Sequence, residues 1–305
     1  MPQPSVPQPR AEIVDLVGES GESFDRFFDR REFEIRTWLE DQHFWHRYRK
    51  TIILQVLQGY VVDRSRTLVD LGCGAGVVAT HLNQHGFRVD YADVHAEALQ
   101  VARQRFEATL GAQSRAPAFV PRFVRVDVTR GFPVDDYHGY LLLDVLEHLP
   151  DDVAVLRALR DRMQAAANRR VPSGGDPEPS DFVLLTVPAF PSLWSPWDDL
   201  EMHKRRYTLA TARHLCEEAG FEVIRSTCFF FPLFFAAAAV KAVRLVRNAL
   251  GRPPEPAQAI TDLAEAKTTP TLSRLVLGLL APERTWLRYR NLSLGTSILV
   301  LARPK

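Results

Sequence analysis

The stretch that decides the fold is Thr67-Leu-Val-Asp-Leu71 followed by Gly72-Cys-Gly-Ala-Gly76, an apolar run that ends in three alternating glycines. A short apolar run that ends in glycines is typical of a buried strand, and the residues after Gly76 are spaced as in a helix that reaches about Gln84. Glycines at a strand-to-helix turn adopt conformations that other residues avoid and let a ligand approach the main chain. The stretch therefore predicts a strand, a ligand-binding turn and a helix.

The same alternation continues along the chain on both sides of this stretch. Upstream, aromatic and aliphatic residues at three- and four-residue steps predict two helices between Phe24 and Leu57. Strands that alternate with helices imply a parallel sheet with helices on both faces. The predicted strands downstream cover residues 86–93, 123–128, 140–145, 182–187, 221–230 and 295–303. One predicted helix begins at about residue 96, and two others cover residues 151–167 and 208–219.

Composition excludes several classes of protein. The 305 residues carry 38 basic and 37 acidic side chains, and this balance argues against binding nucleic acid through its phosphates. Three scattered cysteines, Cys73, Cys216 and Cys228, do not form a disulfide framework or a zinc knuckle. The few cysteines favour a reducing compartment, so we expect a cytoplasmic location. The N-terminus lacks a basic region before an apolar run, so we expect no signal peptide. We also expect no bound metal.

Four of the predicted strands end in carboxylates: Asp70, Asp93, Asp127 and Asp144. Each residue alone is compatible with a solvated loop or a helix cap. Together they lie at the carboxyl ends of successive strands, where open α/β sheets bind ligands. By analogy with other nucleoside-binding α/β proteins, Asp93 is placed to accept hydrogen bonds from both hydroxyls of a ribose.

The glycine turn does not have the dinucleotide spacing G-x-G-x-x-G, because position 77 is Val. An acidic residue followed by G-x-G-x-G instead resembles the first motif of class I S-adenosylmethionine-dependent methyltransferases. The resemblance implies a Rossmann-like seven-stranded sheet whose last strand is antiparallel, S-adenosylmethionine as the cofactor, and Asp127 and Val128 at the adenine ring. The cofactor residues that it implies are Asp70, Gly72, Cys73, Gly74, Gly76, Asp93, Val94, Asp127, Val128 and Asp144.

The fourth strand continues into Asp144-Val-Leu-Glu-His-Leu-Pro-Asp151, which is similar to the segment that follows this strand in many small-molecule methyltransferases. Enzymes of this superfamily that methylate adenine, cytosine or glutamine amides carry a D/N-P-P-Y type turn at this place. This chain lacks that turn, so we do not expect those acceptors.

A second signature follows the fifth strand. Residues 188–208 resemble a bacterial branch of the superfamily with the pattern L-W-S-x-x-D-x-x-x-x-H-x-R-R-Y, which tends to carry an upstream H-F/W-W element and a G-T-S strand. The upstream element is matched by His43-Phe44-Trp45 and the strand by Gly295-Thr296-Ser297, so the resemblance extends from about Glu40 to Lys305. The loop pattern is matched by Leu193, Trp194, Ser195, Asp198, His203, Arg205, Arg206 and Tyr207.

Two histidines are candidates for the base that an alcohol or phenol acceptor requires. His203 has Asp198 available to orient it, and His148 stands next to Glu147. The structural alternatives are that His148 caps the following helix and that His203 packs beside Tyr207.

Four residues of the second signature are expected to bind the acceptor: Trp194, Arg205, Arg206 and Tyr207. The two arginines suit a carboxylate or phosphate, which they can hold bidentately. The alternative is that either arginine pairs with Asp198 or Asp199.

We expect an enzyme that methylates a small-molecule, glycan or lipid-linked acceptor, foremost an O-methyltransferase. The alternatives are an N-methyltransferase acting on a small-molecule or peptide amine, and a methyltransferase-fold binding protein without catalysis. The pattern indicates neither the acceptor nor the oligomeric state.

The excess length is expected at two places. Residues 1–40 are predicted to form a disordered leader and a helical segment, and residues 41–305 a methyltransferase domain with a helical insertion at about 231–292, where nine basic side chains face four acidic ones. The apolar run from Cys228 to Val240 is too short to cross a bilayer. A helix over 233–250 has a broad apolar face, and the alternatives are that it packs on the core, covers the acceptor, or contacts the inner membrane face through 229–250.

Overall fold

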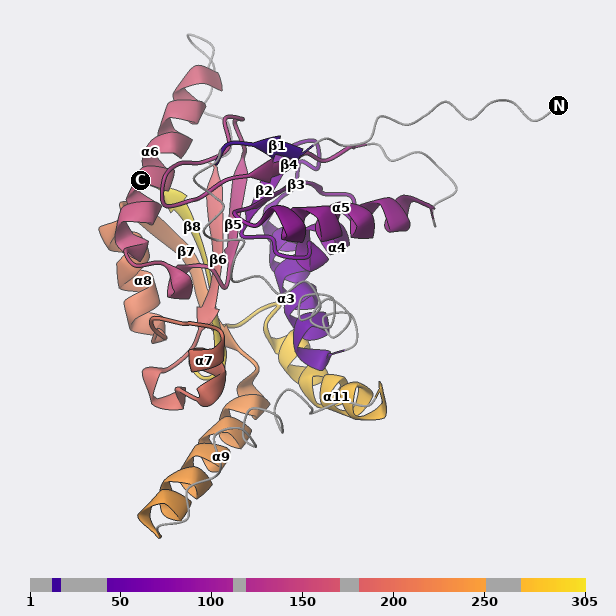
Figure 1. The fold of residues 1–305 in the computed structure, drawn as a ribbon. Coiled ribbons are helices and arrows are strands. Elements are labelled where there is room, and N and C mark those ends of the chain that lie inside the picture. Colours follow the sequence, from indigo (N-terminus) through magenta and orange to yellow (C-terminus); the bar gives the residue numbers. More distant parts are fainter. Residues whose placement is uncertain (1–12, 18–42, 112–118, 171–180, 251–269) are drawn as a thin grey trace, which may run out of the picture.

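The computed structural model describes residues 13–17, 43–111, 119–170, 181–250 and 270–305. Within them one sheet of eight strands runs through the molecule in the order β1-β4-β3-β2-β5-β6-β8-β7 (Figure 1). The strands are β1 (Ile13–Asp15), β2 (Thr67–Leu71), β3 (Arg88–Asp93), β4 (Phe123–Arg125), β5 (Gly139–Leu143), β6 (Phe182–Pro188), β7 (Phe221–Phe229) and β8 (Ser297–Pro304).

The seven expected strands are all present, and the predicted class of fold is confirmed. The pairs from β4 through β6 are parallel, while β8 is antiparallel to both of its neighbours, β6 and β7. The order reverses beside β2, where β3 lies on one side and β5 on the other. Such a switch point leaves a crevice at the carboxyl ends of the strands, which is where ligands bind in open α/β sheets.

The eighth strand is a correction to the sequence analysis, which placed residues 13–15 in the N-terminal leader and helical segment. Ile13–Asp15 pairs in parallel with β4, with Ile13 opposite Phe123. An ion pair of 3.2 Å between Asp15 and Arg125 holds its end. The rest of the predicted leader and its first helix, up to residue 42, lies outside the described residues, as does the loop at 171–180.

Helices cover both faces of the sheet, as the alternation predicts (Figure 1). The helices α3 (Phe44–Tyr60), α4 (Val77–Gln84) and α5 (Ala96–Gly111) pack on one face, together with part of the chain near the C-terminus. The helices α6 (Asp152–Arg170) and α8 (Leu209–Glu218) pack on the other face. Each interface is a separate apolar cluster.

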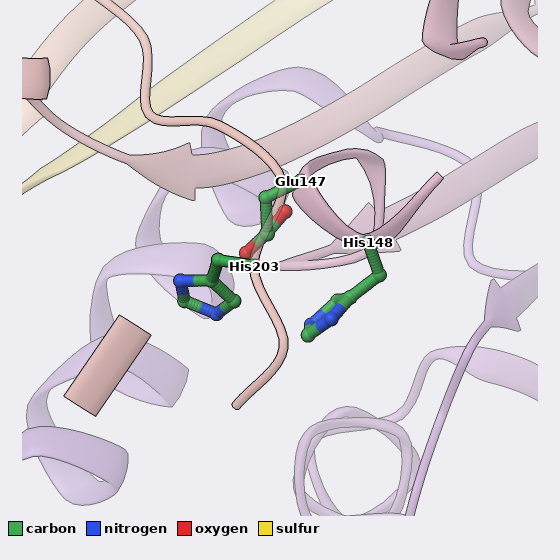
Figure 2. Close-up of side chains that lie close together, drawn as sticks. All are labelled: Glu147, His148 and His203. Carbon is green, nitrogen blue, oxygen red and sulfur yellow. The ribbon is translucent and has the colours of Figure 1, made fainter. Parts of the chain in front are cut away.

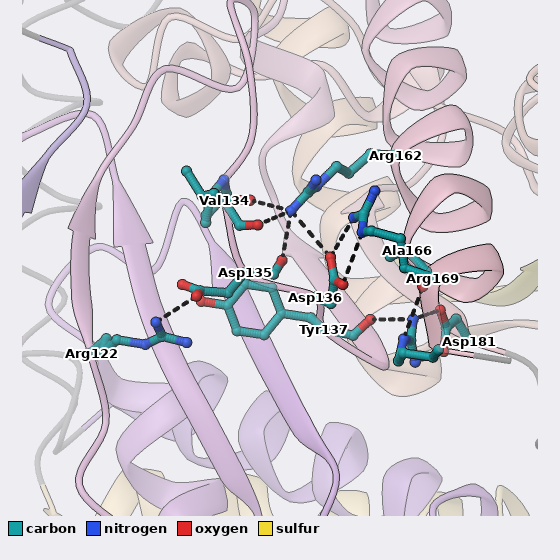
Figure 3. Close-up of polar contacts among 11 residues, drawn as sticks. Arg122, Val134, Asp135, Asp136, Tyr137, Arg162, Ala166, Arg169 and Asp181 are labelled. Atoms are coloured by element: carbon teal, nitrogen blue, oxygen red, sulfur yellow. Dashed lines mark hydrogen bonds and ion pairs between the residues drawn. The ribbon is translucent and has the colours of Figure 1, made fainter. Parts of the chain in front are cut away.

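The amino ends of the central strands are fastened by charged groups (Figure 3). Arg162 on α6 donates to the carbonyl oxygens of Pro133, Val134 and Asp135 in the segment that leads into β5. In the same segment, Arg169 pairs with Asp136 at 2.6 Å and Arg122 pairs with Asp135 at 2.6 Å. Ion pairs and hydrogen bonds therefore stabilise the amino ends of the central strands, opposite the glycine turn at their carboxyl ends.

Between β7 and β8 the described residues form two long helices. α9 (Phe231–Ala249) begins directly after β7, and α11 (Pro270–Trp286) precedes β8 and packs against α3 (Figure 1). The last residue of β7, Phe229, pairs with the first residue of β8, Ser297. Among the described residues, no helix is long and apolar enough to cross a membrane.

Candidate functional site

The glycine turn connects β2 to α4, and all three glycines have positive φ angles: 77° at Gly72, 52° at Gly74 and 72° at Gly76. A Cβ atom on Gly72 would lie 2.6 Å from Val145, and one on Gly76 would lie 2.8 Å from Ala102 and from Tyr91. A Cβ atom on Gly74 would meet nothing within 4 Å. The outer two glycines are therefore required by packing, while the middle one borders open space.

Asp93, at the end of β3, fixes the shape of this turn. One carboxylate oxygen accepts a hydrogen bond of 2.8 Å from the Gly74 amide, and the other accepts one of 2.9 Å from the His95 amide. The residue between them, Val94, accepts a hydrogen bond from the Arg125 side chain through its carbonyl oxygen. Asp93, which is predicted to bind the ribose, is thus joined to the glycine turn by a hydrogen bond.

Asp70 lies beneath the turn and is almost fully buried. Burial raises the pKa of its carboxyl group to about 7; the nearby Asp93 also raises it, and Arg49 opposes both. One of its oxygens, Oδ1, has no hydrogen-bond partner among the described residues. A buried acceptor without a partner is costly, so this atom is available to a donor on a ligand.

Asp127 and Val128 follow β4, where the resemblance predicts the adenine end of the cofactor. The Asp127 carboxylate accepts hydrogen bonds from the backbone and the hydroxyl of Thr129, at 2.9 and 2.6 Å. Arg130 lies 3.4 Å from its second oxygen. Val128 is partly buried beside the second apolar cluster.

Asp144, after β5, has the unusual φ angle of 57° for a residue with a side chain. Its carboxylate forms an ion pair of 2.7 Å with Arg49 on α3, which also lies 3.4 Å from the Thr186 hydroxyl. The guanidinium of Arg49 stands 5.2 Å from the centre of the Trp45 ring. The sequence analysis missed Arg49; its only signal was its position one helical turn after the His43-Phe44-Trp45 element.

The histidine of that element begins α3. The Nδ1 atom of His43 accepts a hydrogen bond of 3.2 Å from the Trp45 amide, as an N-cap does. Trp45 stacks on Phe230 with ring centres 5.9 Å apart. The element therefore anchors the helix that presents Arg49 to the site.

Asp198 is the centre of the second signature, in α7 (Pro196–Leu200), and its side chain has no exposed surface. His203 Nδ1 lies 2.9 Å from one oxygen, and Arg206 contacts both oxygens, at 2.6 and 3.0 Å. Burial alone would raise the pKa of Asp198, but hydrogen bonds from His203 and Arg206 outweigh it and hold the pKa well below the ordinary value. The expected pairing of His203 with Asp198 is therefore present.

Arg205, Arg206 and Tyr207 each contact another group of the protein. Arg206 also donates to the Ala189 carbonyl at 3.0 Å, and Arg205 pairs with Asp152 at 2.9 Å. The Tyr207 hydroxyl donates to the same Asp152 carboxylate at 2.6 Å. The structure therefore favours internal pairing for both arginines, the alternative that the sequence left open, and gives no support to their predicted contact with the acceptor.

Trp194 is partly buried, as Arg205 and Arg206 are. Its indole nitrogen donates to Asp199 at 3.0 Å, and its carbonyl oxygen lies 3.4 Å from the Lys241 ammonium group on α9.

His148 lies at the end of a short 3-10 helix (Leu146–His148) after β5, and its ring meets that of His203 edge-on with centres 4.9 Å apart. Figure 2 shows both imidazole rings beside the carboxyl group of Glu147. Ligand atoms of the three residues lie within 4.8 Å of one another. Glu147 is fully buried and neither of its oxygens has a hydrogen-bond partner among the described residues.

The central part of the chain matches a known family. Residues 69–167, which include the glycine turn and all four strand-end carboxylates, match the family model of a methyltransferase domain. This chain has a methyltransferase fold. The curated relatives align only in part, so this chain spans 24% and 44% of the length of the two relatives described next.

The ribosomal RNA small subunit methyltransferase C of Alcanivorax borkumensis is 34% identical over 80 residues, or 25% of this chain. The ubiquinone biosynthesis O-methyltransferase of Serratia proteamaculans is 30% identical over 116 residues, or 37% of this chain. A solved phosphoethanolamine N-methyltransferase 2 of Haemonchus contortus, bound to phosphomonomethylethanolamine and S-adenosylhomocysteine, superposes with a TM-score of 0.53. That match covers 93% of this chain and 60% of the other at 13% identity, and so supports the methyltransferase fold alone.

The environment of Asp70 leads to a prediction about stability. Because burial raises its pKa from 3.8 to about 7, the ionised form destabilises the folded state. Asp70→Asn retains an oxygen acceptor and cannot ionise. Its stability relative to wild type should therefore increase as the pH rises from about 4 to about 7 and level off above.

Urea denaturation of both proteins across this pH range measures the difference. Asp161→Asn is the control, since that side chain on α6 is 64% exposed. A stability difference for Asp70→Asn that does not change with pH would contradict the assignment.

Proposed function

We propose that this protein binds S-adenosylmethionine at the carboxyl ends of β2 to β5 and transfers its methyl group to a small-molecule acceptor. The observation that carries the proposal is the hydrogen bond by which Asp93 holds the glycine turn, at the strand ends of a methyltransferase fold. Gly74 leaves the open space that a ligand in close contact with the main chain needs. The unpartnered oxygen of Asp70 suits the ammonium group of the cofactor's amino-acid end.

Each strand end supplies one part of the cofactor site. Residues 70–76 would hold the amino-acid end, Asp93 the ribose hydroxyls, and Asp127 with the Val128 amide the adenine ring. When bound, the sulfonium supplies a methyl group that is already activated, so the protein has to position the acceptor and exclude water.

The acceptor would enter beside His148 and His203, and we place O-methylation first. Asp198 remains ionised because Arg206 and His203 surround it, so it can hold His203 through Nδ1. The opposite ring nitrogen is then available to take the proton of an acceptor hydroxyl. Burial and the neighbouring His203 lower the pKa of His148 to about 4, which leaves His148 uncharged and able to accept a hydrogen bond at neutral pH.

The exposed helix α9 leads us to place the acceptor at a lipid surface. None of its 19 residues is buried, and it carries three basic and no acidic side chains. Apolar side chains on it are far more exposed than is usual: Phe235 is 53% exposed, Val240 60% and Leu245 60%. Such a helix binds anionic membranes through both its apolar area and its charge.

Contacts link α9 to the loop that follows β6 (residues 189–208), which we propose borders the acceptor. The ring of Phe234 lies 5.3 Å from that of Phe190, and Lys241 approaches the Trp194 carbonyl. A surface that engages α9 is therefore adjacent to the loop in which the His203 and Asp198 pair lies.

The first prediction concerns the cofactor. S-adenosylhomocysteine should bind the purified protein, and Asp93→Ala should weaken that binding by about tenfold or more, since the variant loses the carboxylate that shapes the turn and accepts from the ribose. Isothermal titration calorimetry measures both affinities, with Asp161→Ala on the exposed face of α6 as the control. If the wild-type protein gives no heat with S-adenosylmethionine and none with S-adenosylhomocysteine, the proposed function is refuted.

The second prediction concerns His203. His203→Ala should lower transfer from methyl-labelled S-adenosylmethionine to compounds in a bacterial extract by about a hundredfold, as expected for loss of a general base. Its affinity for S-adenosylhomocysteine should stay near that of wild type. The matched control is His214→Ala, whose side chain on α8 is 76% exposed. If affinity and transfer fall together, His203 is a structural residue.

The third prediction concerns α9. The protein should sediment with vesicles that contain phosphatidylglycerol at low salt, and less so as salt screens the charges. Replacing Lys241, Arg244 and Arg247 together by Gln should reduce the bound fraction several-fold, whereas three exposed arginines elsewhere, Arg157, Arg213 and Arg303, provide the matched control. Failure of the wild type to sediment at low salt would rule out the membrane contact.

A further inference from the structure

Glu147, His148 and His203 form a cluster that the sequence analysis did not recognise, since it expected no metal. We propose that these three side chains bind one divalent transition-metal ion, with zinc the best match to the donor atoms. Binding of the ion does not require methyl transfer, but its consequence for the reaction rests on the proposed function.

The donor set and its spacing support a metal site. Two imidazoles and one carboxylate form a common ligand set for zinc and for iron(II), with positions left open for a further ligand. The ligand atoms here lie within 4.8 Å of one another. Ligands of a tetrahedral zinc ion at 2.0–2.2 Å are about 3.4 Å apart, so a small closing movement of these side chains would complete the site.

The burial of Glu147 is a second argument for a cation site. Its side chain has no exposed surface, and neither oxygen has a partner among the described residues. The nearby guanidinium groups are already engaged, since Arg49 pairs with Asp144 and Arg206 pairs with Asp198. A buried carboxylate is retained when it is paired or binds a metal. A cation between Glu147 and the two imidazoles would provide that pairing.

Both imidazoles are held in the way that metal ligands usually are. The Nδ1 atom of His203 is fixed by Asp198, which in turn is fixed by Arg206 and by the Ser195 hydroxyl at 3.0 Å. His148 is hydrogen-bonded to the backbone of Glu201. Carboxylate and carbonyl partners of this kind orient a histidine ring and leave its other nitrogen for the metal.

The ion would change how the acceptor loses its proton. In the metal-free protein His203 takes that proton, whereas in the loaded protein His203 is a ligand. Glu147, His148 and His203 would hold the ion, which would lower the pKa of an acceptor hydroxyl at its open position and so replace His203 as the means of removing that proton.

Calorimetric titration of the chelator-treated full chain with Zn²⁺ tests the site. We expect one ion per chain, and Glu147→Gln and His148→Ala should each weaken binding by about tenfold or more. His214→Ala should bind as wild type does. Titration with Co²⁺ gives a second readout, because its visible absorption reports the ligands directly and should change in Glu147→Gln.

Each variant is also titrated with S-adenosylhomocysteine, which shows that it is folded and separates the two proposals. Ion binding without S-adenosylhomocysteine binding would leave the metal site standing and overturn the proposed function. S-adenosylhomocysteine binding without heat from Zn²⁺ or colour from Co²⁺ would overturn the metal site alone. Unchanged ion affinity in both Glu147→Gln and His148→Ala would also overturn it.

Discussion

The loop after β6 depends on the buried ion pair between Asp198 and Arg206. Asp198 has no exposed surface, so its charge is tolerable only because Arg206 meets both oxygens and His203 and Ser195 meet them as well. Removal of one partner from such a pair typically costs about 3–5 kcal/mol, because the other charge is left buried. The pair also fixes where the loop begins, because Arg206 donates to the carbonyl oxygen of Ala189, the residue directly after β6.

The fold was largely predictable because hydrophobic period and glycine position are local signals. β2 was predicted to the residue, and β3 and β6 to within two residues, since apolar runs bounded by glycine or proline have few other interpretations. β1 could not be found in the same way. Three residues carry no period, and their pairing with β4 depends on a contact between positions 13 and 123.

The position of a candidate residue was predictable where it follows from a strand end, as for Asp93 at the end of β3. It was less predictable where a role depends on what a side chain meets. Arg205 and Arg206 are adjacent in sequence and were expected to bind an acceptor, yet each turns to a different buried carboxylate, Asp152 or Asp198. His148 and His203 come together only because the chain between them, residues 149–202, returns to the same point, and no spacing rule describes such a return.

The two ends of the sheet carry different polar groups. At the amino ends, arginines on α6 meet carbonyl oxygens and carboxylates, although the Nε atom of Arg162 has no partner among the described residues. At the carboxyl ends, Asp70 Oδ1 and both oxygens of Glu147 are buried without a hydrogen-bond partner among those residues. A buried polar atom without a partner calls for an explanation, and a bound ligand or ion is one. The proposed cofactor and metal sites both use these carboxylate oxygens.

The pairing of Phe229 with Ser297 has a consequence for how this fold can diversify. The chain leaves the sheet at the end of β7 and returns to it at the adjacent residue of β8, so the two ends of the intervening segment are already joined by the ladder. The entropic cost of closing a loop grows only slowly with its length. α11 packs into the core through Leu280 and Glu283, whereas no residue of α9 is buried. α9 is therefore the part of this segment that can change in length or sequence at little cost to the core, and with it the surface that the molecule presents beside β7.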